Sequence, residues 1–345
     1  MKLLLYADNH FSKYSSILRS RGGKYSKRLE NQIQSLNWVE EFAKEQGCDA
    51  IVCLGDFFDK PTLDAEEISA LKEIKWNKDM RRVFLVGNHE LGIRMQDEYN
   101  SANLFSLIEN SEVINKPMAM LDGDTLILLL PYLLEVNDDT LHKIIPQWIT
   151  DKEKDLFKRI IILSHNDLKG VQYGGYISKS GLNLNEIDEC CDLFINGHIH
   201  NGDWINKKVL NLGNLTGQNF SESDSIYNHC VCILDTNTLD TQCIMNPYGI
   251  YFKKLEYYDY LNKRTCNHPM VLSISCKENE LESAKNYCES HSYIMDYRII
   301  VEREQKEVKT EKVETLNHID KFIQFIHNNL GCSDMIDSEL ENILK

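Results

Sequence analysis

Long apolar runs are missing from this sequence of 345 residues, of which 42% are hydrophobic and 26% are charged. No run approaches the roughly 20 apolar residues that a membrane-spanning helix needs. The opening stretch MKLLLYAD has neither the length nor the small-residue cleavage site of a secretory signal peptide. We therefore expect a cytoplasmic protein (in the host cytoplasm if a phage encodes it) with no membrane partner.

Cysteine pairs with metal-binding spacing are also missing. The 11 cysteines are scattered and include no CxxC motif, which argues against a zinc ribbon or a disulfide framework. Two pairs, Cys190 with Cys191 and Cys230 with Cys232, lie in apolar sequence, and we predict that they are buried structural thiols. A reducing compartment agrees with the cytoplasmic expectation.

Basic residues are few, because 38 Lys and Arg stand against 53 Asp and Glu, for a net charge of −15. Such a balance disfavours binding of nucleic acid by the whole surface. The segment 11–29 is the exception. It contains no acidic residue, its glycine and serine content up to about residue 26 predicts a long loop, and its basic residues are Lys13, Arg19, Arg21, Lys24, Lys27 and Arg28.

Short apolar runs alternate with helical patterns along the first 200 residues or so. The runs predict strands at 2–7, 50–54, 82–86, 125–131, 159–164 and 193–196. Helical spacing predicts helices over about 27–46, after the N-cap Asp64, over about 101–109 and over the acidic stretch 138–158. Strands that alternate with helices form a parallel-rich sheet, so we predict an α/β fold. The chain length predicts a second domain or an appendage.

Polar side chains follow five of these strands at the point where each strand ends. The donors are Asp8, His10, Asp56, Asn88, His165, His198 and His200. Any one of them alone is better explained as a cap or turn residue, but five coincident strand ends favour a shared site. Ligands of open α/β sheets gather at the carboxyl ends of strands. One ion takes about four to six ligands, so seven donors predict two ions that share a carboxylate.

These motifs, in this order, resemble those of the calcineurin-like metallophosphoesterases: Asp8-x-His10, Gly55-Asp56, Gly87-Asn88-His89-Glu90, His165 and Gly197-His198-x-His200. The resemblance covers about residues 1–258 and implies a metallophosphoesterase β-sandwich flanked by helices. It implies one metal held by Asp8, His10, Asp56 and His200, and a second held by Asp56, Asn88, His165 and His198. It also implies that His89 is the catalytic histidine that contacts the phosphate.

The residue types suit phosphoester hydrolysis. Two cations about 3.5–4 Å apart polarise a phosphoryl oxygen and lower the pKa of a water, whose hydroxide attacks phosphorus. His89 would offset charge on the phosphoryl oxygens and donate to the leaving oxygen. Glu90 or Asp59 would complete the catalytic set by orienting a histidine. The ligands suit Mn²⁺, Fe, Zn²⁺ or Mg²⁺, and the resemblance favours two Mn²⁺ ions.

Within the family, the string 54–59 (LGDFFD) and the stretch 209–215 are similar to the DNA-repair nuclease subunit SbcD and its phage recombination relatives. Phosphoprotein phosphatases carry Asp-Arg-Gly after the second motif, which this chain lacks. The chain departs from the SbcD pattern at Glu90, where Asp is usual, and at Asp59, where some relatives have His. The resemblance implies a manganese-dependent exonuclease and endonuclease in DNA repair, recombination and replication. The basic segment starts three residues after Asp8, so we expect it to lie over the metals with its Lys and Arg side chains on the DNA backbone. A solvated loop that binds no ligand is the alternative.

Beyond residue 258 the pattern changes. A strand over 270–276, a helix over 278–290 and a strand over 294–301 form a β-α-β unit, similar in placement to the capping domain of SbcD-like nucleases. We assign a small α+β capping domain to 259–312 and C-terminal helices to 313–345. By resemblance these helices dock onto the coiled-coil base of an SbcC-type, SMC-like ATPase. Folding back onto the capping domain is equally compatible with the pattern.

Three functions are compatible with the sequence: a DNA nuclease that acts with an ATPase, a stand-alone phosphoprotein phosphatase or small-molecule phosphodiesterase, and a non-catalytic scaffold. The intact ligand set disfavours the scaffold. By resemblance we also expect a homodimer formed through the helices after the second and third motifs. The apolar stripes of these helices are equally compatible with burial in the monomer; they consist of Ile68, Leu71, Ile74, Leu104, Leu107 and Ile108.

Overall fold

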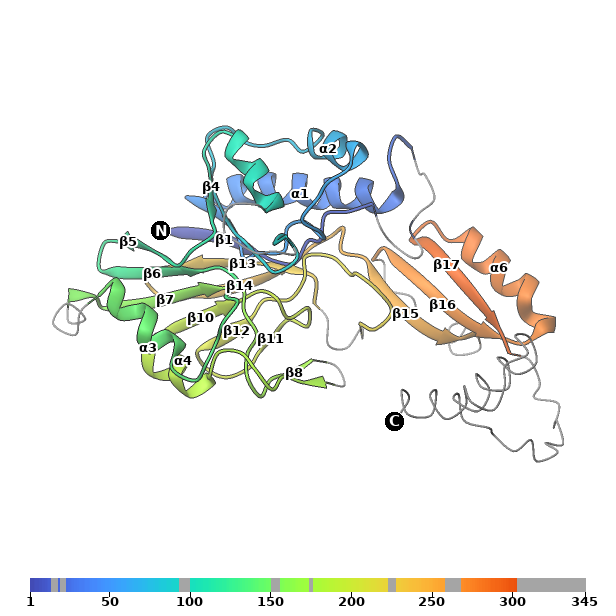
Figure 1. The fold of residues 1–345 in the computed structure, drawn as a ribbon. Coiled ribbons are helices and arrows are strands. Elements are labelled where there is room, and N and C mark those ends of the chain that lie inside the picture. Colours follow the sequence, from blue (N-terminus) through green and yellow to red (C-terminus); the bar gives the residue numbers. More distant parts are fainter. Residues whose placement is uncertain are drawn as a thin grey trace, which may run out of the picture. The chain divides into compact units, whose positions relative to one another are not determined.

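The structure is a computed structural model that describes residues 1–13, 18, 23–92, 100–149, 156–173, 176–222, 228–257 and 268–302. These residues belong to one unit that ends at Glu302 and contains two six-stranded sheets, a three-stranded sheet and a two-stranded hairpin (Figure 1). The predicted C-terminal segment 313–345 lies outside the described residues.

The first six-stranded sheet has the strand order β14-β13-β1-β2-β3-β4. Its strands are β1 (Lys2–Tyr6), β2 (Ala50–Cys53), β3 (Arg81–Leu85), β4 (Ser111–Ile114), β13 (Cys230–Asp235) and β14 (Thr241–Met245). Strands β1 to β4 are parallel, and β13 pairs antiparallel with β1. Strand β1 is buried on both faces, which is why its apolar residues follow one another without alternating with polar residues.

The second six-stranded sheet has the order β11-β12-β10-β7-β6-β5. Its strands are β5 (Met118–Asp122), β6 (Thr125–Leu130), β7 (Arg159–Ser164), β10 (Leu193–Asn196), β11 (Asp203–Trp204) and β12 (Val209–Asn211). Leu5 and Val52 of the first sheet pack against Ile127 and Ile161 of the second in one core cluster. The two sheets therefore form the predicted β-sandwich.

Helices cover the outer faces of the sandwich (Figure 1). α1 (Lys27–Glu45) and α2 (Ala65–Leu71) pack on the first sheet. α3 (Thr140–Ile144) and α4 (Leu184–Cys190) pack on the second. The predicted cap of α2 is confirmed, because the Asp64 carboxylate accepts backbone N–H groups of the first turn. Among the described residues no helix is long and apolar enough to cross a membrane.

Two predicted helices are different in the structure. The segment 101–109 forms the 3-10 helix η1 (Ser101–Leu107). The acidic stretch 138–158 is not one helix: α3 ends and a 3-10 turn, η2 (Ile145–Gln147), follows it through Pro146. Proline lacks an N–H group and its ring fits only the first turn of a helix, so the helical pattern breaks there.

The three-stranded sheet consists of β15 (Tyr251–Glu256), β16 (Met270–Cys276) and β17 (Ile294–Val301), with all pairs parallel. The short η4 (Glu278–Glu280) and α6 (Leu281–Ser290) connect the last two strands and give the predicted β-α-β unit. Because β15 pairs with β16 along its whole length, the small sheet begins at Tyr251, earlier than the boundary predicted at 258. The hairpin β8 (Gln172–Tyr173) and β9 (Tyr176–Ile177) lies apart from these sheets in the pairing.

The described cysteines are free thiols, and Cys191, Cys230 and Cys232 are buried as predicted, with Cys190 half-buried. The two apolar stripes expected at a dimer interface divide between core and surface. Leu71 and Ile74 are buried in the monomer, whereas Ile68 is 40% exposed and Leu107 is 81% exposed.

Candidate metal centre

The ends of β1, β2, β3, β7 and β10 bring all seven predicted donors to one edge of the sandwich. Four of them have left-handed backbone conformations, with φ of 51° at Asp8, 48° at His10, 49° at Asp56 and 70° at His198. Residues with a Cβ atom rarely adopt this region, and such strain concentrates at functional sites. The turns are therefore shaped to aim these side chains.

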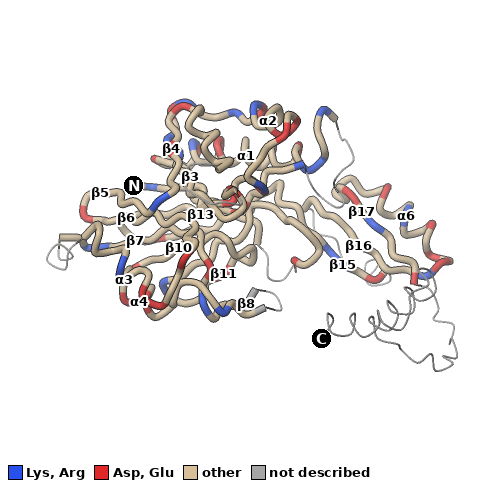
Figure 2. The backbone as a smooth tube through the Cα atoms, in the orientation of Figure 1, with Lys and Arg blue, Asp and Glu red and all other residues tan. Residues whose placement is uncertain are grey.

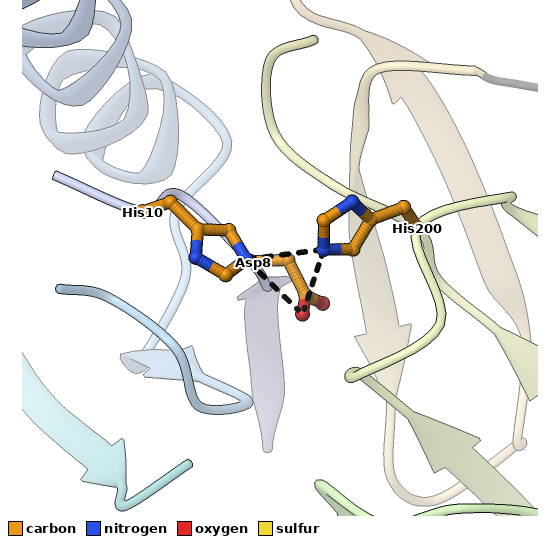
Figure 3. A group of neighbouring side chains, drawn as sticks. All are labelled: Asp8, His10 and His200. Carbon is orange, nitrogen blue, oxygen red and sulfur yellow. Dashed lines mark hydrogen bonds and ion pairs between the residues drawn. The ribbon is translucent and has the colours of Figure 1, made fainter. Parts of the chain in front are cut away.

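One half of the centre consists of Asp8, His10 and His200 (Figure 3). The Nε2 atoms of His10 and His200 lie 3.0 Å apart. The Oδ1 atom of Asp8 lies 4.0 Å from the first of these nitrogens and 3.9 Å from the second. Asp8 is fully buried and His10 is nearly so, whereas His200 is partly exposed. We call this group the first half.

The second half consists of Asn88, His165 and His198. The Oδ1 atom of Asn88 lies 2.9 Å from Nδ1 of His198 and 3.3 Å from Nε2 of His165. Asp56 joins the halves, because its Oδ2 atom lies 3.2 Å from Nε2 of His165 and 3.9 Å from Nε2 of His10. One carboxylate between two groups of nitrogen and oxygen donors is the arrangement that a pair of divalent cations requires.

The ring nitrogens that point away from the centre each face an oxygen atom. Nδ1 of His165 lies 2.6 Å from the carbonyl oxygen of Leu54. The corresponding carboxylate contacts are Asp59 at 3.3 Å from His10 Nδ1, Asp167 at 3.3 Å from His198 Nε2, and Glu222 at 3.7 Å from His200 Nδ1. Metal-ligating histidines almost always have such an acceptor behind them, which fixes the ring and the tautomer. The residues therefore fit two bound cations.

Sequence reasoning missed Asp167 and Glu222 as supporting residues. Each reaches its histidine from a separate loop, and no local spacing marks that contact. Glu222 is 4% exposed, and its Oε1 atom accepts hydrogen bonds from the backbone N–H of Gln218 and from Nδ2 of Asn214, both at 2.9 Å.

Charge in the centre is balanced between Asp56 and His165. Burial alone would raise the pKa of Asp56, but His165, His10 and His89 lower it below its ordinary value. Burial alone would lower the pKa of His165, but Asp56, helped by Asp8 and Glu90, raises it to about 9. This raised pKa favours a proton on His165 at neutral pH, and a bound cation would displace that proton.

Glycine is required at two turns of the centre. A Cβ atom at Gly87 would collide with the Asp56 carboxylate, and one at Gly55, which has φ of 97°, would collide with the His165 ring. The motif glycines thus allow the shared carboxylate and its histidine partner to approach the backbone of neighbouring loops.

His89, the predicted catalytic histidine, lies at the rim, with its side chain 42% exposed. Its Nδ1 atom lies 3.0 Å from the carbonyl oxygen of Asp59, and its ring contacts that of His10 edge-on at 4.6 Å between centroids. Its backbone N–H donates to Asp56. Asp59 lies beside both histidines, 3.7 Å from His89 Nδ1 at its carboxylate, so it stands where a residue that orients a histidine would stand.

Glu90 has a different position from the one expected. It is fully buried, and its carboxylate accepts hydrogen bonds from the backbone N–H groups of Phe58, at 3.0 Å, and Gly87, at 2.6 Å. It therefore joins the second and third motif loops instead of orienting a histidine ring. Burial, followed by the charge of Asp56, raises the pKa of Glu90 to about 7.

The basic segment is described only in part, and Arg19 and Arg21 lie outside the described residues. Lys24 pairs with Glu73, and Lys27 donates to the carbonyl oxygen of Met295 at 2.6 Å. Arg28 is 3% exposed and donates to the carbonyl oxygen of His10, which places it behind the centre. Figure 2 shows basic and acidic positions interspersed along the described chain.

Two histidine-lined halves that share a carboxylate fit the donor set of a dinuclear metallohydrolase. A family model described as calcineurin-like phosphoesterase matches residues 1–202, so the chain belongs to the calcineurin-like phosphoesterase family. A search of curated proteins found no match.

Solved structures similar to the chain include an archaeal phosphodiesterase, with 14% identity, a TM-score of 0.34, and coverage of 71% of this chain and 99% of that one. A dimetal phosphatase from Danio rerio has 15% identity, a TM-score of 0.39 and coverage of 71% and 98%. A protein from Thermus thermophilus has 13% identity, a TM-score of 0.40 and coverage of 71% and 98%.

Proposed function

We propose that this metal-dependent phosphoesterase is a DNA nuclease, the hydrolytic subunit of an SbcCD-like repair and recombination complex. The observation that carries the hydrolytic part is the convergence of seven donors from five loops around Asp56, with His89 exposed beside them. The proposal of DNA as substrate rests on the SbcD-like string 54–59, the basic segment and the β-α-β unit that follows the sandwich.

Two divalent cations bound in the centre would supply Lewis acidity toward a phosphoryl oxygen and a water acidified for attack. His89 then acts as the proton donor to the leaving oxygen. Its Nδ1 atom donates to the carbonyl oxygen of Asp59, which leaves Nε2 for the substrate. When protonated, Nε2 donates to the leaving oxygen as the bond from phosphorus to that oxygen breaks and the bond to the water oxygen forms. Asp59 and Glu90 keep His89 and its loop in place.

The direct test is hydrolysis of linear duplex DNA by the purified chain with Mn²⁺. His89→Ala should lower kcat by about 10²–10⁴-fold, the usual contribution of a general acid, while the bound metal content stays unchanged. His142→Ala is the matched control, because this histidine is 51% exposed on α3 and contacts Glu186 and Glu189. Full activity on a nitrophenyl monoester with no action on DNA would instead support the phosphatase or small-molecule phosphodiesterase.

The partner proposals concern a second copy of the chain and an ATPase. For the homodimer, Ile68 and Leu107 are the exposed members of the two apolar stripes. Leu107→Glu should shift the chain to a monomer in sedimentation velocity, whereas Leu156→Glu, at a position 69% exposed elsewhere, should not. A dimer that survives Leu107→Glu together with Ile68→Glu would exclude this interface.

For the ATPase, the proposed docking element is the segment 313–345. The full chain should copurify with an SbcC-type, SMC-like ATPase, and a chain that ends at Glu302 should not. Equal copurification of the two chains would move the interface to the described part of the molecule.

A further inference from the structure

A cavity of about 130 Å³ adjoins the second half of the metal centre, and the mechanism above does not use it. One wall follows the end of β6 and is formed by Tyr132, Leu133, Leu134 and Val136. The second wall is formed by Asn166, Asp167, Ser180 and Gly181, and Asn166 joins it to the first. The first wall is aromatic and apolar, whereas the second carries a carboxylate, an amide and a hydroxyl group.

The cavity lies next to a predicted metal ligand. The Asp167 carboxylate is 3.3 Å from Nε2 of His198, and the ring of Tyr132 lies 5.7 Å from that of His198 between centroids. Nδ1 of His198 points the other way, toward Asn88. Only the width of the His198 ring therefore separates the cavity from the metal centre. A substituent on a phosphate bound at the metal centre can reach the cavity.

The walls are fixed before any ligand binds. Oδ1 of Asn166 accepts from the backbone N–H of Leu133 at 2.9 Å, and its Nδ2 donates to the carbonyl oxygen of Pro131 at 3.0 Å. In the second wall, a Cβ atom at Gly181 would collide with the backbone of Asp167. A glycine and a fully hydrogen-bonded amide thus set the shape, as in preformed ligand sites.

The chemistry of the walls selects the ligand. The negative charge of the Asp167 carboxylate disfavours a second phosphate. The carboxylate oxygens accept hydrogen bonds from ring N–H groups. Tyr132 and the neighbouring aliphatic side chains favour a flat ring, because bases stack on aromatic side chains. A volume of about 130 Å³ is enough for one ring.

We propose that this cavity is a subsite for a single nucleobase, that of the nucleotide next to the scissile phosphate. The inference rests on the proposed nuclease function and names the part of the substrate that the second half recognises. A base inserted there is unstacked from its neighbours, so the strand at the scissile phosphate has to be unpaired.

The test compares two substrates with identical phosphates, an oligothymidylate and an abasic tetrahydrofuran oligomer of the same length. Leu134→Trp fills the cavity from a position that is 56% exposed, and Tyr132→Ala removes the aromatic wall. Both variants should lower kcat/KM for the oligothymidylate by about tenfold, within the range for loss of base stacking, and leave the abasic oligomer unchanged. Leu121→Trp, 62% exposed on β5 and paired with the far end of β6, should change neither.

Equal losses on both oligomers, or no loss on either, would overturn the subsite. Cleavage of duplex DNA with no cleavage of either oligomer would overturn the subsite alone. If the wild-type chain cleaves neither these oligomers nor linear duplex DNA, the nuclease proposal fails and the subsite is judged separately by thymidine binding in ligand-observed NMR. Thymidine that binds the wild-type chain and not Leu134→Trp then supports the cavity as a base site. Thymidine that does not bind the wild-type chain overturns it.

Discussion

Each half of the metal centre has two histidines, but the two halves differ in charge. The first half combines the Asp8 carboxylate with Asp56, and the carboxylates of Asp59 and Glu222 stand behind its histidines. The second half replaces a carboxylate with the amide of Asn88, and one of its histidines is backed by the neutral carbonyl of Leu54. More negative charge around a cation strengthens its binding. We therefore expect the first half to hold its ion more tightly than the second.

The largest effect is expected where the halves meet. Asp56→Asn removes the carboxylate that both halves share, so the chain should lose at least one of its two ions. Turnover should fall by about a thousandfold or more, since metal assistance is worth several kcal/mol. Metal analysis together with kinetics would check this. Asp124→Asn, in a surface ion pair with Lys158, serves as the control. Two retained ions with full turnover would show that the halves are independent.

A smaller effect should separate the halves. Glu222→Gln weakens the support of His200, and Asp167→Asn weakens that of His198. Loss of such a contact typically costs about 10–100-fold in metal affinity. Because Glu222 is 4% exposed and Asp167 is 34% exposed, the loss should approach 100-fold for the first variant and stay near tenfold for the second. Titration with Mn²⁺ followed by electron paramagnetic resonance would measure both. A greater loss in Asp167→Asn would reverse the proposed ranking.

A dependence of metal binding on pH arises at the second half, and we expect it to be at most about tenfold per pH unit. Asp56 raises the pKa of cation-free His165 to about 9, and a cation binds only the neutral ring. Lowering the pH from 9 therefore weakens binding by up to tenfold per unit, and raising it above 9 removes the dependence. Calorimetry at pH 7 in two buffers of different ionisation enthalpy should detect proton release. The absence of release at pH 7 would mean that His165 is already neutral.

The sequence was sufficient for the strands that carry the ligands. Strands such as β1 and β7 are continuous apolar runs that end in polar residues. A run of this kind predicts a strand without any information on the neighbouring strands. The structure places all seven predicted donors at one edge of the sandwich, and their role as metal ligands stays a prediction. The antiparallel partner of β1 was not predicted, although β13 is also an apolar run, because nothing in a run states which strand it pairs with.

The residues that support the ligands could not be predicted for a related reason. Glu222 reaches His200 from a loop beyond β12, and Glu90 bonds backbone groups of two different loops. Contacts of this kind depend on tertiary packing, whereas the motifs fix only the residues nearest to the cations. The break at Pro146 is the exception, because proline inside a helical pattern was a visible local signal.

The most direct measurement is anomalous X-ray diffraction from crystals of the chain soaked in Mn²⁺. We predict two anomalous peaks, one on each side of the Asp56 carboxylate, with the stronger occupancy beside Asp8 and His200 at limiting Mn²⁺. A single peak away from Asp56, or no peak at all, would contradict the dinuclear centre.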